Sequence, residues 1–188
     1  MGDGELDIAI ERAQAGDARG FDALFHACAA SVVGYLRARK VNDPDGTANE
    51  VFLRAFRTIH TFRGDTAGFR SWLFTIAHNA AIDDARRRRR RVRETTLESL
   101  PGAAGGDVEV DADALLSQQR VEAMLDGLSP DQREVIMLRV IGDLSVDQTA
   151  AIVGKSHEAV KALQRRGLGA LRRALSNDDA QDDEAVTR

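Results

Sequence analysis

The sequence predicts an all-α chain of two small helical domains joined by a flexible acidic linker. Only three of its 188 residues are proline, no sustained alternation of apolar and polar residues indicates a strand, and apolar residues recur at helical spacing in two separate stretches. Between residues 94 and 113 that spacing stops in a run rich in Gly, Ala and Asp, which cannot bury enough apolar area to offset the entropy of ordering. We therefore expect domains at 1–93 and 114–175, a linker at 94–113 and an acidic disordered tail at 176–188.

Four helices are expected in the first domain. A weakly amphipathic segment covers 6–15, and Asp17 is placed to cap the next helix, whose wide apolar face runs from Phe21 to Leu36 and includes Cys28, which we expect to be buried. Residues 42–46 have turn chemistry, so the third helix is expected over about 47–60. Two glycines interrupt 62–68, and the last helix then continues into six consecutive arginines.

The second domain contains two capping boxes, which are strong signals for helix starts. They are Ser129-Pro130-Asp131-Gln132 and Ser145-Val146-Asp147-Gln148. Gly154 closes the helix after the second box, and Ser156 is placed to cap the next one. The order of helix, glycine-containing turn and helix predicts a helix-turn-helix over 145–175.

The last helix of this unit is a candidate DNA-recognition helix. Its outward face carries hydrogen-bonding side chains, concentrated in the N-terminal half that enters the major groove in such motifs. These are His157, Glu158, Lys161, Gln164, Arg165 and Arg166. The alternative interpretation is an ordinary solvated face of a helical bundle.

The net charge of −4 is the sum of opposed blocks. Residues 86–93 sum to +7, whereas 94–113 hold six acidic residues and no basic one. Consecutive arginines point all round a helix, so the phosphates of a nucleic acid are a natural partner. The alternatives are a solvated hinge, or pairing of the arginines with the acidic linker of the same chain.

Several function classes are not expected. A single cysteine rules out an internal disulfide and a multi-cysteine metal site, and the four histidines have no ligand spacing. We find no phosphate-binding glycine loop and no nucleophile motif, so we expect neither catalysis nor a cofactor or metal. Without a signal peptide or an apolar stretch near ~18 residues, we expect a cytoplasmic protein with no membrane contact.

Two sets of residues resemble a known family. Residues 49–56 with 62–65, and residues 69–79, resemble region 2 of sigma factors, and residues 128–171 resemble region 4. With only these two domains and a short linker, the chain is similar to the extracytoplasmic-function group of the sigma-70 family over about 5–92 and 115–175. The resemblance implies a region 2 helical bundle and a region 4 helix-turn-helix.

The resemblance also implies partners and site residues. Such proteins bind the RNA polymerase core at its clamp and flap, read the −10 and −35 elements of promoter DNA, and in some cases bind an anti-sigma factor. The implied core-binding residues are Asn49, Glu50, Leu53, Arg54 and Arg57. The implied −10 residues are Phe62, Arg63, Asp65, Thr66, Asn79, Asp83, Arg86, Arg87 and Arg90. The −35 candidates are Arg139, Ser156, His157, Glu158, Lys161, Arg165 and Arg166.

Two other functions remain open from the residues alone. One is a stand-alone helix-turn-helix transcriptional regulator with a helical sensing domain, which would bind duplex DNA tightly without polymerase. The other is a helical interaction module that does not bind DNA, in which the basic run pairs with the acidic linker.

Overall fold

The computed structural model describes residues 2–95 and 120–186, with side chains described for 2–92 and 120–176. Within these ranges all regular structure is helical, which confirms the predicted all-α class. In chain order the elements are α1 (Asp3–Gln14), α2 (Ala18–Ala38), α3 (Pro44–Thr58), the short 3-10 helix η1 (Ile59–Thr61), α4 (Thr66–Thr95), a helical segment at 120–126, α6 (Pro130–Val140), α7 (Val146–Val153) and α8 (His157–Val186).

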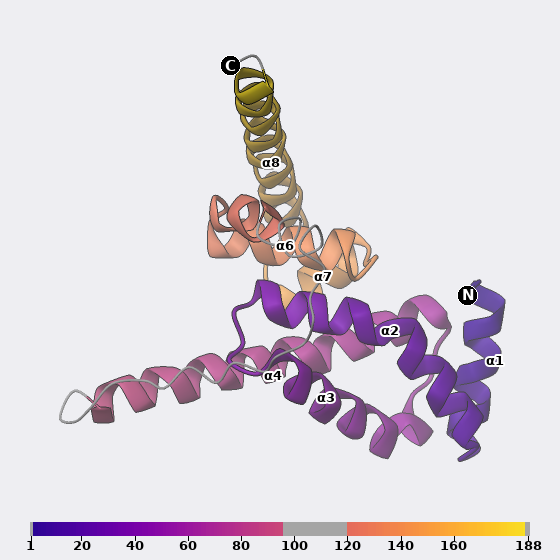
Figure 1. Cartoon of the computed structure of the whole chain (residues 1–188). Helices are drawn as coiled ribbons and strands as arrows, with labels where there is room; N and C mark the ends of the chain where they lie inside the picture. The colour runs from indigo at the N-terminus through magenta and orange to yellow at the C-terminus, as the bar shows by residue number, and fades with distance from the viewer. Residues whose placement is uncertain (1, 96–119, 187–188) are drawn as a thin grey trace.

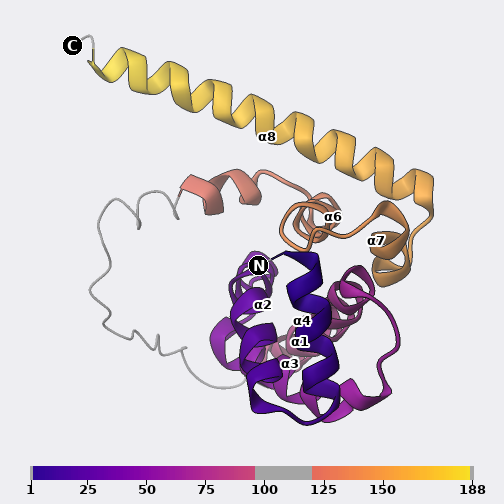
Figure 2. The same ribbon diagram turned by 90° about the vertical axis from the view of Figure 1, so that its right-hand side faces the viewer.

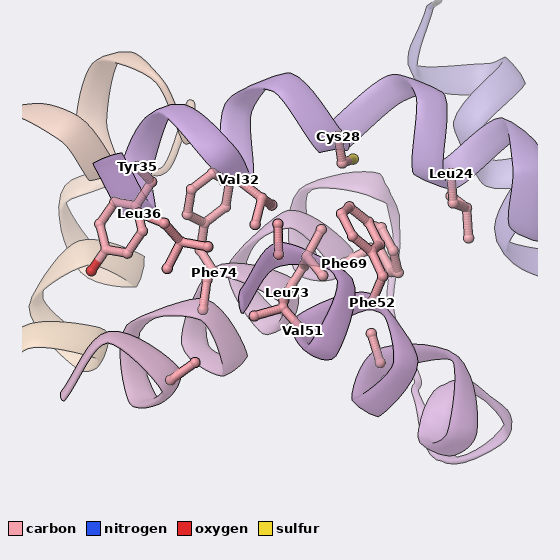
Figure 3. Close-up of a cluster of buried hydrophobic side chains, with 14 of the residues drawn as sticks. Leu24, Cys28, Val32, Tyr35, Leu36, Val51, Phe52, Phe69, Leu73 and Phe74 are labelled. Carbon is pink, nitrogen blue, oxygen red and sulfur yellow. The ribbon is translucent and has the colours of Figure 1, made fainter. Parts of the chain in front are cut away.

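The first four helices enclose a shared apolar core (Figure 3). The buried side of α2 supplies Leu24, Val32 and Leu36, which meet Phe69 and Leu73 of α4. Cys28 is buried in the same cluster, as predicted from its place on the apolar stripe. Asp17 caps α2 by accepting from the backbone N–H of Arg19 at 3.0 Å, which confirms that part of the prediction.

The start of α3 was predicted three residues too late. Pro44 opens the helix and Asp43 caps it, accepting from the backbone N–H of Gly46 at 2.9 Å. Proline costs nothing in the first helical turn, because the N–H that it lacks has no partner within the helix there. The residues that resemble a turn are therefore a helix start.

Both expected irregular segments begin later than predicted, where the structure describes them. Helix α4 continues through the six arginines to Thr95, so the first two residues of the predicted linker are helical. The linker residues 96–119 lie outside the described ranges. Helix α8 runs to Val186, although a disordered tail was expected from residue 176. No Gly or Pro occurs between 176 and 186, so no residue there stops the helix.

Both capping boxes are present as predicted. Ser129 accepts from the backbone N–H of Gln132 at 3.3 Å, and Ser145 accepts from that of Gln148 at 3.1 Å. Gly154 ends α7 with φ +63°, a left-handed conformation that glycine adopts without strain. The short turn directs α8 across α6 and α7, where Val135, Val160 and Leu163 form a small core.

The two groups of helices pack against each other. Helix α6 lies beside α2, and α7 lies beside the start of α4 (Figures 1 and 2). Met137, Leu138 and Leu144 of the second group belong to the same buried cluster as the first. Among the described residues, no helix is both long and apolar enough to cross a membrane.

Candidate functional site

The predicted core-binding residues all lie on the outer side of α3. Ala48, Val51, Phe52 and Ala55 are buried on the inner side, and the predicted residues are exposed on the other. Glu50 and Arg54 form an ion pair at 3.6 Å, one helical turn apart. Leu53 is 56% exposed between these charges. An apolar side chain left in water within a charged surface is typical of a contact site.

The loop before α4 is held from below by two of the predicted −10 residues. Phe62 is buried, with its ring centroid 5.8 Å from that of Phe69 and 5.4 Å from that of Trp72. Thr66 is also buried, and one carboxylate oxygen of Asp7 on α1 accepts from its hydroxyl at 2.7 Å and from its backbone N–H at 2.9 Å. In this arrangement the two side chains support the loop and do not form its surface.

Arg63 and Asp65 form the exposed rim of the same loop. The Arg63 guanidinium donates to the carbonyls of His60 and Phe62 at 2.8 and 2.7 Å. Asp65 accepts from the backbone N–H of Gly68 at 2.8 Å, which caps the start of α4. Both side chains therefore rigidify the loop while remaining at the surface.

The other −10 candidates share one face of α4. Asn79, Asp83, Arg86, Arg87 and Arg90 are exposed and follow each other at three- or four-residue spacing. Asp83 and Arg86 form an ion pair at 3.6 Å. The arginines of the run are not equivalent, because Arg88 points to the buried Asp84 on the other side and forms an ion pair with it.

The helix-turn-helix presents the predicted −35 residues from α8. Ser156 caps the helix by accepting from the backbone N–H of Ala159 at 3.2 Å. Glu158, Lys161 and Arg165 form an exposed stripe, with Arg166 beside it. His157 lies 2.7 Å from Asp147 of α7. Arg139 of α6 donates to the Leu144 carbonyl and, at 3.2 Å, to Gln164 of α8, so its guanidinium lies between α6 and α8.

Sequence reasoning missed a polar cluster between the two groups of helices. One oxygen of the Glu134 carboxylate lies 2.8 Å from Nδ1 of His78, 3.4 Å from the Tyr35 hydroxyl and 3.3 Å from the Arg39 guanidinium. Figure 3 shows the Tyr35 hydroxyl at the end of the apolar cluster that faces the C-terminal helices. Tyr35 and Glu134 are 99 residues apart, so no local pattern could have paired them.

The cluster perturbs the ionisation of two of its members. Burial acts to raise the pKa of Glu134, but the hydrogen bond from His78 and the charge of Arg39 outweigh it and hold the pKa below the ordinary glutamate value. Burial, reinforced by the Glu134 charge, raises the pKa of Tyr35 above its ordinary value. Glu134 is therefore a charged acceptor at neutral pH and Tyr35 a neutral donor.

No group of three or more His, Cys, Asp or Glu side chains in the described part of the chain is arranged to hold a metal ion. The exposed surfaces described above are accordingly suited to macromolecular contacts through hydrogen bonds and charge.

Comparisons with known proteins agree with the division into two groups of helices. Residues 24–91 match the family described as Sigma-70 region 2, and residues 124–173 match Sigma-70, region 4. The ECF RNA polymerase sigma factor BldN of Streptomyces coelicolor is 38% identical over 176 residues, which cover 90% of this chain and 65% of that protein. The chain thus spans slightly less than two thirds of the length of BldN.

Other relatives are matched over more of their length. The ECF RNA polymerase sigma factor SigK of Mycolicibacterium vanbaalenii is 32% identical over 179 residues, covering 91% of this chain and 89% of that protein. The solved structure of CnrH in complex with the cytosolic domain of CnrY is similar with a TM-score of 0.64 at 25% identity, covering 92% of this chain and 99% of that one. The chain belongs to the extracytoplasmic-function group of the sigma-70 family of RNA polymerase sigma factors.

Proposed function

We propose that this chain binds the RNA polymerase core through the outer face of α3 and directs it to promoters that it reads at two places. Residues 1–93 act on the −10 element and residues 114–175 on the −35 element. The chain acts by binding alone, in the cytoplasm, and an anti-sigma factor is a further partner. The complex of the similar protein CnrH with CnrY supports a protein partner for this fold.

The observation that carries the proposal is the α7–Gly154–α8 unit. The left-handed glycine sets the angle between the two helices, and the Ser156 cap leaves the first turns of α8 uncovered, with Glu158, Lys161 and Arg165 on one side. A helix presented in this way fits the major groove, where such side chains hydrogen-bond to base edges and phosphates.

For the −10 element we propose that the charged rim of the loop and the exposed face of α4 contact DNA. Arg63 and Asp65 lie on the rim, with Asn79 on the helix that follows. Unstacked bases need hydrogen-bonding groups at their edges, and an amide such as that of Asn79 can supply both a donor and an acceptor. Arg86, Arg87 and Arg90 are placed to hold the adjacent phosphates.

Run-off transcription with a purified core polymerase and a promoter library tests the function as a whole. We expect initiation at a defined start that depends on this chain, and K161A should weaken promoters that rely on their upstream element while core affinity is unchanged. R173A, which removes an exposed charge three turns further along α8, is the matched control. Tight duplex binding without initiation would instead indicate a stand-alone regulator.

The phosphate contacts of α4 have a separate test in the salt dependence of holoenzyme binding to promoter DNA. R87A/R90A should lower the slope of log K against log salt by about 0.9 for each lost phosphate contact on duplex DNA. R12A/R19A, which removes two exposed arginines of α1 and α2, should leave the slope as it is. Equal slopes for both variants would show that Arg87 and Arg90 contact no phosphate.

A further inference from the structure

We propose that Glu134 and its three partners, Tyr35, Arg39 and His78, form a latch that holds the second group of helices closed on the first, and that promoter binding requires this latch to open. The inference rests on the proposed function for its consequence, but the latch itself is a property of the free protein.

The latch joins three helices through one carboxylate. Glu134 projects from α6 and is only 7% exposed. Its side-chain partners all come from the first group: Tyr35 and Arg39 from the end of α2 and its C-cap, and His78 from α4. Because no side chain of its own group pairs with Glu134, the charge is compensated only while the two groups are in contact.

The chemistry of the latch makes the closed state reversible. A buried ion pair gives up much of its attraction to the cost of removing both charges from water, so its net contribution is modest. When the groups separate, water can solvate the Glu134 carboxylate and its partners. Loss of a single partner in the closed state is different, because it leaves a buried charge without compensation. The latch therefore fixes the register of the two groups without joining them permanently.

Contacts at the edge of the interface support the same closed arrangement. Lys40 pairs with Asp126 at 2.8 Å, and Arg70 pairs with Asp143 at 2.6 Å. Three of these four side chains are more than half exposed to solvent, so such pairs contribute little stability. The buried Glu134 cluster is thus the polar contact that best distinguishes the closed arrangement from the open one.

The closed arrangement is incompatible with reading both promoter elements. The Gln148 amide of α7 donates to the Ala67 carbonyl at 3.0 Å, so the helix-turn-helix touches the segment proposed to act at −10. Elements centred near −10 and −35 lie about 25 base pairs apart, or roughly 85 Å along B-DNA. The 24 residues 96–119 join the groups, and a chain of about that length reaches at most roughly 80 Å. The chain length thus permits a wide separation once the latch opens.

The test uses the full-length chain and two independent readouts. E134Q keeps the shape of the side chain and removes its charge, and R39M removes the cationic partner. D131N is the matched control, because Asp131 is exposed on the same helix and pairs at 2.9 Å with Lys155 of its own group. Small-angle X-ray scattering measures the radius of gyration of the free protein, and titration with core polymerase measures the apparent Kd.

We expect E134Q and R39M to increase the radius of gyration and D131N to leave it unchanged. If the open state is the minor one, the apparent Kd for core should fall about three- to tenfold in both latch variants, because the fraction of competent protein rises. An unchanged radius of gyration in folded E134Q and R39M would overturn the latch. An increased radius without core binding by any variant would instead contradict the proposed function and leave the latch supported.

A third variant covers the case in which E134Q or R39M does not fold, as judged by circular dichroism. Y35F removes only the hydroxyl that contacts Glu134 and keeps the buried ring, so the helical core is preserved. We expect Y35F to shift the radius of gyration in the same direction by a smaller amount. A Y35F protein as compact as wild type would then count against the latch.

Discussion

Asp7 is predicted to hold the loop before α4 in place from a helix 59 residues away in sequence. In D7A the backbone N–H of Thr66 loses its acceptor, which lies at 2.9 Å, and the Thr66 hydroxyl loses one at 2.7 Å. The hydroxyl can turn to the Asp3 carbonyl at 3.1 Å, whereas the N–H has no such substitute. A buried donor left without a partner costs about 1–3 kcal/mol.

The loss of charge adds to this cost. A carboxylate near the N-terminus of a helix is favourable by roughly 0.3–1 kcal/mol. We therefore expect D7A to lower the free energy of unfolding by about 2 kcal/mol, which for a chain of this size corresponds to a fall in Tm of about 4–8 °C. D7N retains an acceptor oxygen and should recover most of the hydrogen-bonding part.

Urea unfolding followed by circular dichroism measures the effect, with E11A as the control because Glu11 is exposed on the same helix. Open-complex formation with core polymerase should also be slower in D7A, since the loop 62–65 would lose its anchor. The reasoning would be refuted if D7A and E11A unfolded at the same urea concentration. A double-mutant cycle with T66A should show coupling between the two positions.

Two further predictions concern helix packing and pH. G20A should lower the free energy of unfolding by about 1–3 kcal/mol, because the added Cβ would lie 2.4 Å from the backbone nitrogen of Ala13 and force α1 away from α2; thermal unfolding against G4A, where no atom lies within 4 Å, checks it. The lowered pKa of Glu134 stabilises the folded protein above the ordinary glutamate pKa of about 4.3, and this stability is lost as the pH falls through the lowered value. Urea unfolding from pH 7 downward should show a smaller acid loss in E134Q, and equal acid profiles would contradict the assignment.

Much of the helical framework was predictable because its signals are local. The capping boxes at Ser129 and Ser145, the cap at Asp17 and the left-handed turn at Gly154 depend on residues within one helical turn. The exposure of the outer face of α3 likewise follows from the spacing of its apolar residues. The start of α3 and the end of α8 were missed because composition was weighed above capping in one case and above the lack of a helix-breaking residue in the other.

The candidate sites divide in the same way. Which residues of α3, α4 and α8 face solvent could be inferred from helical periodicity, and the structure places Asn79, Lys161 and Arg165 at the surface as expected. Phe62 and Thr66 were expected at the DNA-facing surface of their loop, but the rings of Phe69 and Trp72 and the carboxylate of Asp7 make them its support.

The sequence by itself determined the helices, their order and the charged faces, since each depends on residues a few positions apart. Only the tertiary structure decided that the two groups of helices share a core and meet at Glu134. The physical reason is that a buried carboxylate is acceptable only where partners from other elements compensate its charge. Those partners, at positions 35, 39 and 78, become neighbours of Glu134 only when the chain is folded.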